Sequence, residues 1–270
     1  MNLLKLTVSA ILASVALQAI GQKLPETQQN ALWAASPLKA DGKLDPATRF
    51  QAYNKNTRLS YSLSNDATNL YLVIQSTDVN KILMGGITFT VNAAGKKKEK
   101  DAASFTFPVV SRQTRGQRGQ GGFGQRMGGQ GGTVDSAAVL ERRKQQLAQS
   151  REIKVLGVES IADSLISIYN EYGVKAVSRV DLHGTYIYEL AIPFTLLQID
   201  AAKSKEFAYS IKVNGRQMNI RFEGGGNREG GFGAGGFGGG GNGGGGSRQN
   251  FDPSMFEPTF FWEKYTLAKQ

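Results

Sequence analysis

Few residues of this sequence have side chains suited to catalysis, and they are scattered along the chain. There is no cysteine and only one histidine, His183. The lack of cysteine excludes zinc–thiolate sites, covalent haem attachment and thiol nucleophiles. His183 precedes Gly184 in a segment typical of a hairpin turn, so we expect an exposed turn residue. Because a serine–histidine mechanism would depend on this one side chain, we predict that the protein is not an enzyme.

Two sets of carboxylates could in principle act on a ligand. Asp163 with Glu171, or Glu189 with Asp181, could serve a glycan hydrolase as acid and base, but no feature of the sequence fixes their separation. Oxygen ligands for a structural Ca²⁺ could come from four residues: Asp41, Asp45, Asp66 and Asp78. Their spacing matches no compact calcium loop, so we expect turn-forming carboxylates and predict no cofactor.

The chemistry of binding is more evident than that of catalysis, above all in one basic segment. Its four arginines, with no acid among them, are Arg112, Arg115, Arg118 and Arg126. Together with the interleaved Phe123, this composition is typical of tails that bind nucleic acid. A solvated basic loop is the simpler interpretation. A third interpretation is multivalent contact with an anionic envelope surface or a partner protein.

The two tryptophans, Trp33 and Trp262, are the other candidate ligand residues. An indole ring can stack on a sugar, but a large aromatic side chain in a strand more often packs in the core. Both tryptophans lie in segments with strand-like sequence, so both interpretations stay open.

Glycine divides the chain into a core and two insertions. Most of the 34 glycines fall in two windows, and such runs bury too little apolar area to offset the entropy of ordering them. We therefore predict two disordered glycine-rich loops, at residues 112–132 and 222–248. Strand-like sequence resumes after each loop, and 258–267 has the sequence of a final core strand. Residues 22–270 are thus expected to form a single domain that the loops interrupt.

The remaining sequence predicts an all-β fold. Leu59, Tyr61 and Leu63 alternate with polar residues, and a turn follows at 64–69. The next run, 70–74, is apolar on both faces, as in a central strand of a sheet, and the two runs together are expected to form a hairpin. Further strands are predicted at 87–91, 105–107, 153–158, 174–180, 185–192, 207–213 and 218–222. Strands at this spacing are typical of an antiparallel β-sandwich.

One short surface helix is expected within this β-rich chain. Residues 134–150 place Val139, Leu140 and Leu147 among charged and amide side chains. Asp135 or Ser136 is the expected N-cap. The helix would connect the first glycine-rich loop to the sandwich.

Residues 1–21 are typical of a secretory signal peptide. Lys5 precedes the apolar run Leu6–Ala19, which ends in a small-x-small motif at Gly21. A membrane anchor is the alternative, but the run contains polar residues and is shorter than the roughly 20 apolar residues of a span. We expect no transmembrane segment and an exported protein, whether periplasmic, on the outer surface or secreted. Export makes an anionic envelope component a better partner for the net charge of +10 than nucleic acid.

Three short motifs, taken in order, resemble the family 9 carbohydrate-binding modules and the wider DOMON-like sandwiches. They are DGKLD at Asp41–Asp45, YSLSNDATNLYL at Tyr61–Leu72 and YELAIP at Tyr188–Pro193. The resemblance implies a sandwich fold, because short motifs of turn and core residues support an inference about fold better than one about function. It also implies a sugar held between aromatic side chains, although neither Trp33 nor Trp262 matches a family ligand residue. Some DOMON-like relatives bind haem through axial His or Met, which would point to His183 with Met84 or Met218.

The leading hypothesis is therefore an exported, non-catalytic binding or envelope-associated scaffold module, whose ligand is a glycan or a partner protein. The alternative is a module that carries haem or another redox cofactor. A glycan hydrolase is the third hypothesis, and it requires carboxylates that face one cleft.

Overall fold

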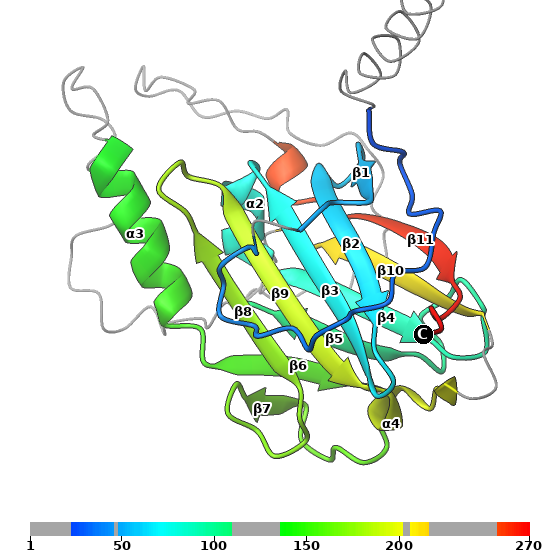
Figure 1. Cartoon of the computed structure of the whole chain (residues 1–270). Coiled ribbons are helices and arrows are strands. Elements are labelled where there is room, and N and C mark those ends of the chain that lie inside the picture. The colour runs from blue at the N-terminus through cyan, green and yellow to red at the C-terminus, as the bar shows by residue number, and fades with distance from the viewer. Residues whose placement is uncertain (1–22, 46–47, 110–135, 202–205, 216–252) are drawn as a thin grey trace, which may run out of the picture.

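The computed structural model describes residues 23–45, 48–109, 136–201, 206–215 and 253–270 (Figure 1). Its strands are β1 (Ala52–Asn54), β2 (Leu59–Asn65), β3 (Asn69–Ser76), β4 (Ile87–Asn92), β5 (Ala103–Phe107), β6 (Glu152–Leu156), β7 (Leu165–Ser167), β8 (Lys175–Val180), β9 (Tyr186–Pro193), β10 (Phe207–Val213) and β11 (Thr259–Tyr265). Its helical segments are α2 (Val79–Gly85), α3 (Ser136–Ala148), α4 (Phe194–Leu197) and the 3₁₀ turn η2 (Pro253–Met255).

The strands form two antiparallel sheets that pack face to face, which confirms the predicted sandwich. One sheet, called sheet A below, has the order β1-β2-β3-β9-β8, and sheet B has the order β11-β10-β4-β5-β6-β7. Figure 1 shows sheet A in front of sheet B. One continuous cluster of buried side chains from both sheets fills the space between them.

The predicted hairpin between β2 and β3 is present. Leu63 pairs with Leu72, and the Asp66 side chain closes the turn by accepting hydrogen bonds from the backbone N–H groups of Thr68 and Asn69, both at 2.7 Å. β3 lies between β2 and β9 and is buried on both faces, as its apolar sequence predicts.

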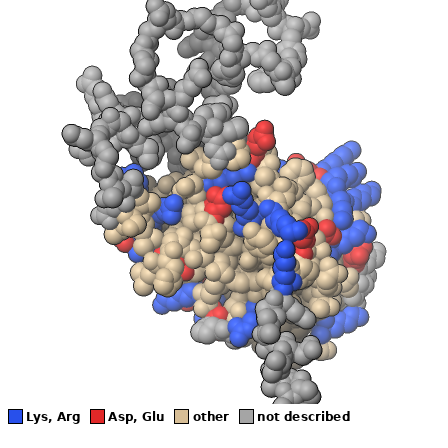
Figure 2. All heavy atoms as spheres, turned by 90° about the horizontal axis from the view of Figure 1, so that it is seen from above, with Lys and Arg blue, Asp and Glu red and all other residues tan. Residues whose placement is uncertain are grey.

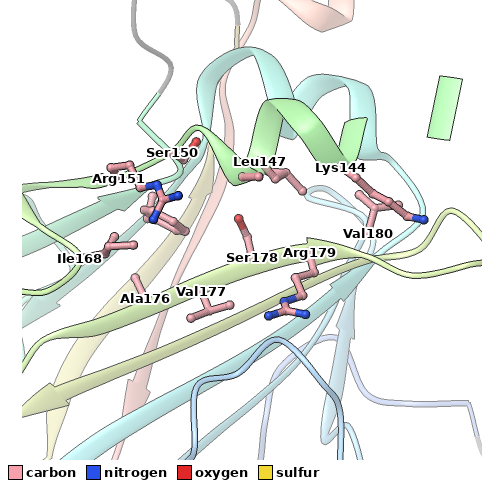
Figure 3. A pocket seen from close by; sticks show the side chains of 12 residues that line it. Lys144, Leu147, Ser150, Arg151, Ile168, Ala176, Val177, Ser178, Arg179 and Val180 are labelled. Atoms are coloured by element: carbon pink, nitrogen blue, oxygen red, sulfur yellow. The ribbon is translucent and has the colours of Figure 1, made fainter. Parts of the chain in front are cut away.

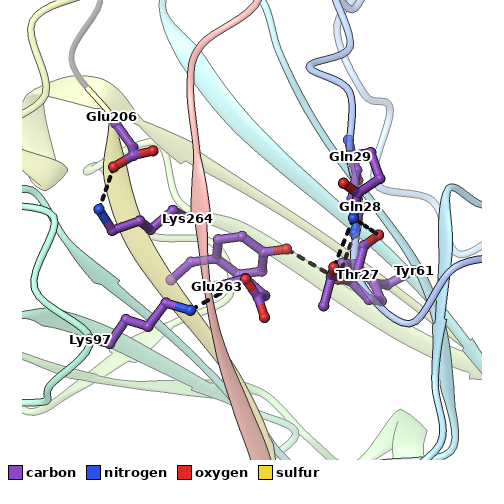
Figure 4. A network of polar contacts seen from close by, with 9 residues as sticks. Thr27, Gln28, Gln29, Tyr61, Lys97, Glu206, Glu263 and Lys264 are labelled. Atoms are coloured by element: carbon purple, nitrogen blue, oxygen red, sulfur yellow. Dashed lines mark hydrogen bonds and ion pairs between the residues drawn. The ribbon is translucent and has the colours of Figure 1, made fainter.

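The outer face of sheet A is covered by the first described segment, residues 23–45, which crosses β8, β9 and β3 (Figure 1). The backbone N–H of Gly42 donates a hydrogen bond of 2.7 Å to Glu189 of β9, which is 4% exposed. At the other end of the segment, the Gln28 N–H donates to the Tyr61 hydroxyl at 3.2 Å, and that hydroxyl lies 3.1 Å from the Tyr209 hydroxyl of sheet B (Figure 4). The segment is thus attached to the interior strand β9 and to the core.

The predicted surface helix is confirmed as α3. Leu147 is buried, and Leu140 packs against the core. Arg143 donates a hydrogen bond of 2.9 Å to the Asn80 side chain, and Gln146 donates one of 2.9 Å to the Leu83 carbonyl; both acceptors belong to α2. The two apolar contacts with the core and the two hydrogen bonds to α2 therefore hold α3 beside β8 (Figure 1). Ser136 is the first residue of the helix, and Asp135 lies outside the described residues.

Several details differ from the sequence-based expectation. The segment 258–267 does form a strand, but β11 is an edge strand that bonds only β10 within its sheet, and only one of its faces meets the core. The short strands β1 and β7 and the helices α2 and α4 were not predicted, because three to seven residues give too little periodicity to identify an element. Among the described helices, none is both long and apolar enough to cross a bilayer.

Some predictions concern parts of the chain outside the described residues. These are the signal peptide at 1–21, the glycine-rich loops at 112–132 and 222–248, and the strand at 218–222. They remain predictions.

Candidate functional site

A cavity of about 490 Å³ lies between the C-terminal half of α3 and the edge strand β8 (Figure 3). This volume is within the range of about 300–1,000 Å³ that is usual for small-molecule sites. Leu147 of α3, Phe107 at the end of β5, Ile168 and Ala176 give it apolar walls.

Strand alternation explains why a hydroxyl group faces this cavity. Ala176, Ser178 and Val180 of β8 point to the core side, and Val177 and Arg179 point to the outer face. In register, Ser178 lies opposite Tyr188 of β9, and Val180 lies opposite Tyr186. In Figure 3 the Ser178 hydroxyl points from β8 into the space below α3.

Three hydroxyl groups in this region lack a hydrogen-bond partner. They belong to Ser178, Tyr186 and Tyr188; among the described residues none of the three oxygens has a partner in normal hydrogen-bond geometry, although the Ser178 and Tyr186 hydroxyls lie close enough to interact. Ser178 is 8% exposed and lines the cavity, whereas both tyrosines are fully buried behind it. Desolvation raises the pKa of Tyr186 and Tyr188 well above the usual value, and the neighbouring Ser178 hydroxyl offsets only part of the rise at Tyr186. Since an unpaired buried hydroxyl costs about 1–3 kcal/mol, the cavity has an unmet capacity for hydrogen bonding.

Three cations line the cavity: Lys144, Arg151 and, on the outer-face side of β8, Arg179. In Figure 3, Arg151 lies at one end, Lys144 of α3 at the other, and Ser178 between them. Lys144 forms an ion pair of 2.8 Å with Glu141, and Arg151 donates a hydrogen bond of 3.0 Å to the Tyr169 hydroxyl. Within the described part of the chain, the side chains that line the cavity include no carboxylate or imidazole. The cavity therefore offers hydrogen bonds and positive charge, but no acid–base pair for catalysis.

A second polar cluster surrounds Glu189 on the outer face of sheet A. Desolvation raises the pKa of this carboxyl group, and the negative charge of Asp41 acts in the same direction. The hydrogen bond from Gly42 and the charge of Arg179 offset part of the rise. Gly42 has φ +76°, and a Cβ atom there would lie 2.6 Å from Cδ of Arg179. This close packing leaves no room for a ligand, so the cluster attaches the segment 23–45 to the sheet.

The candidate ligand residues from the sequence do not form one site. Trp33 makes an isolated parallel bridge with Asn65 at the end of β2, and Trp262 lies in β11 opposite Ser210. Both are half-buried, and they belong to different sheets. Arg112, Arg115, Arg118 and Arg126 lie outside the described residues. A role in binding for these six residues remains a prediction.

The candidate calcium ligands take up other tasks in the described structure. Asp66 closes the β2–β3 turn, Asp78 forms an ion pair of 3.4 Å with Arg58, and Asp41 lies beside Gly42 above β9. In the described ranges, no three His, Cys, Asp or Glu residues come close enough to hold a metal ion. The prediction of no cofactor and its alternative, a structural calcium ion, both stay untested.

The candidate haem and hydrolase residues are also dispersed. His183 is exposed in the β8–β9 turn, Met84 is exposed on α2, and Met218 lies outside the described residues. Asp181 accepts hydrogen bonds from the N–H groups of His183 and Thr185, both at 2.8 Å, so it stabilises this turn. Its proposed partner Glu189 is buried beneath Gly42, while Asp163 and Glu171 are both exposed.

Sequence reasoning missed the residues of the cavity. A signal for them exists, since Ser178, Tyr186 and Tyr188 occupy core-facing positions in predicted strands where apolar residues are the rule. Lys144 and Arg151 carried no such signal, because exposed cations are common on any helix or strand end.

Comparisons with known proteins add little to this picture. No protein-family model matches the chain, and no curated protein matches its sequence. Among solved structures, it is similar to a family 9 carbohydrate binding module from Caldicellulosiruptor kristjanssonii in complex with glucose. That similarity covers 68% of this chain and 77% of the module, with 9% sequence identity and a TM-score of 0.31. This distant likeness assigns neither a family nor a ligand.

Proposed function

We propose that this chain is an exported, non-catalytic binding protein that holds a small saccharide in the cavity between α3 and β8. The observation that carries the proposal is the Ser178 hydroxyl, which is 8% exposed, has no hydrogen-bond partner and points into a cavity of about 490 Å³. A ligand that supplies the missing hydrogen bond would remove most of the cost of burying this group.

A saccharide matches the mixed character of the cavity. Sugar rings present apolar C–H faces that can pack on Phe107 and Leu147, and their hydroxyl groups can both donate to and accept from Ser178. A purely apolar ligand would leave Ser178 unpaired. The lining has no carboxylate or imidazole among the described residues, which supports binding without turnover.

Export and charge support an envelope location. Residues 1–21 have the sequence of a signal peptide, and the chain has a net charge of +10. Figure 2 shows that Lys and Arg side chains gather toward one side of the face seen from above, with fewer acids among them. An anionic polysaccharide or envelope surface is the partner that this charge favours.

The test is a calorimetric screen of the purified protein against mono- and disaccharides, beside two serine variants. Ser178→Ala removes the hydroxyl that faces the cavity. Ser210→Ala is the matched control, because Ser210 is also buried and unpaired but lies on sheet B away from the cavity. We expect binding that Ser178→Ala weakens and Ser210→Ala leaves unchanged. Absence of binding across the panel, or equal effects of both variants, would contradict the proposed function.

A further inference from the structure

We infer that the ligand of this cavity is an acidic saccharide, in which a carboxylate of a uronic acid unit pairs with Arg151 while a ring hydroxyl bonds Ser178. This inference rests on the proposed function and adds the charge and the orientation of the ligand.

The charge of the lining is the first argument. The described side chains that line the cavity include three cations, Lys144, Arg151 and Arg179, and no acidic side chain. Glu141, which pairs with Lys144, is 61% exposed and lies outside the lining, so it offsets the charge at one end only. A neutral sugar would leave this positive charge without a partner from the ligand.

The state of Arg151 is the second argument. The guanidinium group donates a hydrogen bond to the neutral hydroxyl of Tyr169, which is itself 78% exposed. A guanidinium group can donate two parallel hydrogen bonds to a carboxylate, and such charge-assisted pairs are about twice as strong as neutral ones. Exchange of the Tyr169 contact for a carboxylate therefore requires no rearrangement of the fold.

The placement of the three polar groups is the third argument. Arg151 comes from the residue before β6, Ser178 from β8 and Lys144 from α3, and Ser178 lies between the two cations (Figure 3). An elongated ligand with its acidic group at the Arg151 end would place its middle over Ser178 and its far end near Lys144. A disaccharide with a carboxylate on each ring has this pattern of charge, and both ends would then meet a cation.

The experiment compares three uronate disaccharides, namely digalacturonate, dimannuronate and diguluronate, with their methyl esters. Esterification removes the negative charges and leaves the sugar skeleton unchanged. We expect at least one acid to bind about tenfold more tightly than its ester, because a charged pair is lost in the ester. We also expect the affinity for the acid to fall as salt rises.

Two variants locate the effect. Arg151→Gln should abolish most of the preference for the acid over the ester. The double variant Lys96→Gln with Lys98→Gln removes two charges at the β4–β5 turn, away from the cavity, and should leave the preference intact. Loss of preference in the double variant alone would overturn the inference, since the acid would then bind at the wrong surface.

The remaining outcomes separate the two proposals. If an ester binds as tightly as its acid and Ser178→Ala weakens both, the inference is wrong and the proposed function stands. If neither form of any disaccharide binds, both are wrong. A preference for the acid that survives Arg151→Gln also overturns the inference.

Discussion

Ser178→Ala should stabilise the ligand-free protein while it weakens ligand binding. The Ser178 hydroxyl is 8% exposed and has no hydrogen-bond partner, so its burial costs about 1–3 kcal/mol. Removal of the hydroxyl should therefore raise the free energy of unfolding by about 1 kcal/mol or more. For a domain of this size, 1 kcal/mol corresponds to an increase in Tm of about 2–4 °C. The lost hydrogen bond should reduce the affinity for a saccharide by up to about tenfold.

The assay is thermal denaturation and calorimetric titration of the same preparations. Ser210→Ala provides the control, since Ser210 is 2% exposed and unpaired as well. Ser210→Ala should raise Tm by a similar amount and leave the affinity for the saccharide unchanged. If Ser178→Ala instead lowers Tm, the hydroxyl already has a stabilising partner in the ligand-free protein, such as a fixed water. The argument that it is kept for a ligand would then be refuted.

Three further changes test the fold around this site. Gly42→Ala should cost roughly 1–2 kcal/mol, because φ there is +76° and the new Cβ would displace Arg179; unchanged urea unfolding would contradict this. Leu147→Ala should cost about 2–5 kcal/mol and enlarge the cavity, and an unaltered Tm would show that α3 is not packed on the core. Burial raises the pKa of Glu189 in the folded protein, so the protein should lose stability as pH rises from 4.5 through the folded pKa. Glu189→Gln should reduce this loss. If the wild-type and variant proteins lose stability equally over this pH range, Glu189 is not its cause.

The long elements of the fold could be predicted from sequence because their side chains alternate cleanly. β2 and β3 follow the predicted hairpin, and β8 with β9 follows the predicted turn at His183–Gly184. Pairing order between distant segments was not predictable, since alternation identifies the buried face of a strand but not its neighbour. β11 illustrates the limit, because its aromatic sequence suggested a core strand and yet it lies at an edge.

The site was less predictable than the fold for a physical reason. A cavity arises from the way separate elements meet, and here α3, the end of β5 and β8 come from three distant parts of the chain. Sequence alone drew attention to rare residue types such as Trp33 and Trp262. The residues that matter for the cavity are a common serine and two common cations, which become notable only when the fold buries Ser178 without a partner.

A crystal structure of the protein soaked with the disaccharide that binds best tests the central claim most directly. We predict a sugar between α3 and β8, with one hydroxyl within hydrogen-bond distance of Oγ of Ser178 and a carboxylate at Arg151. A sugar bound elsewhere, for example beside Trp262 on sheet B, with the cavity below α3 unoccupied, would contradict the account.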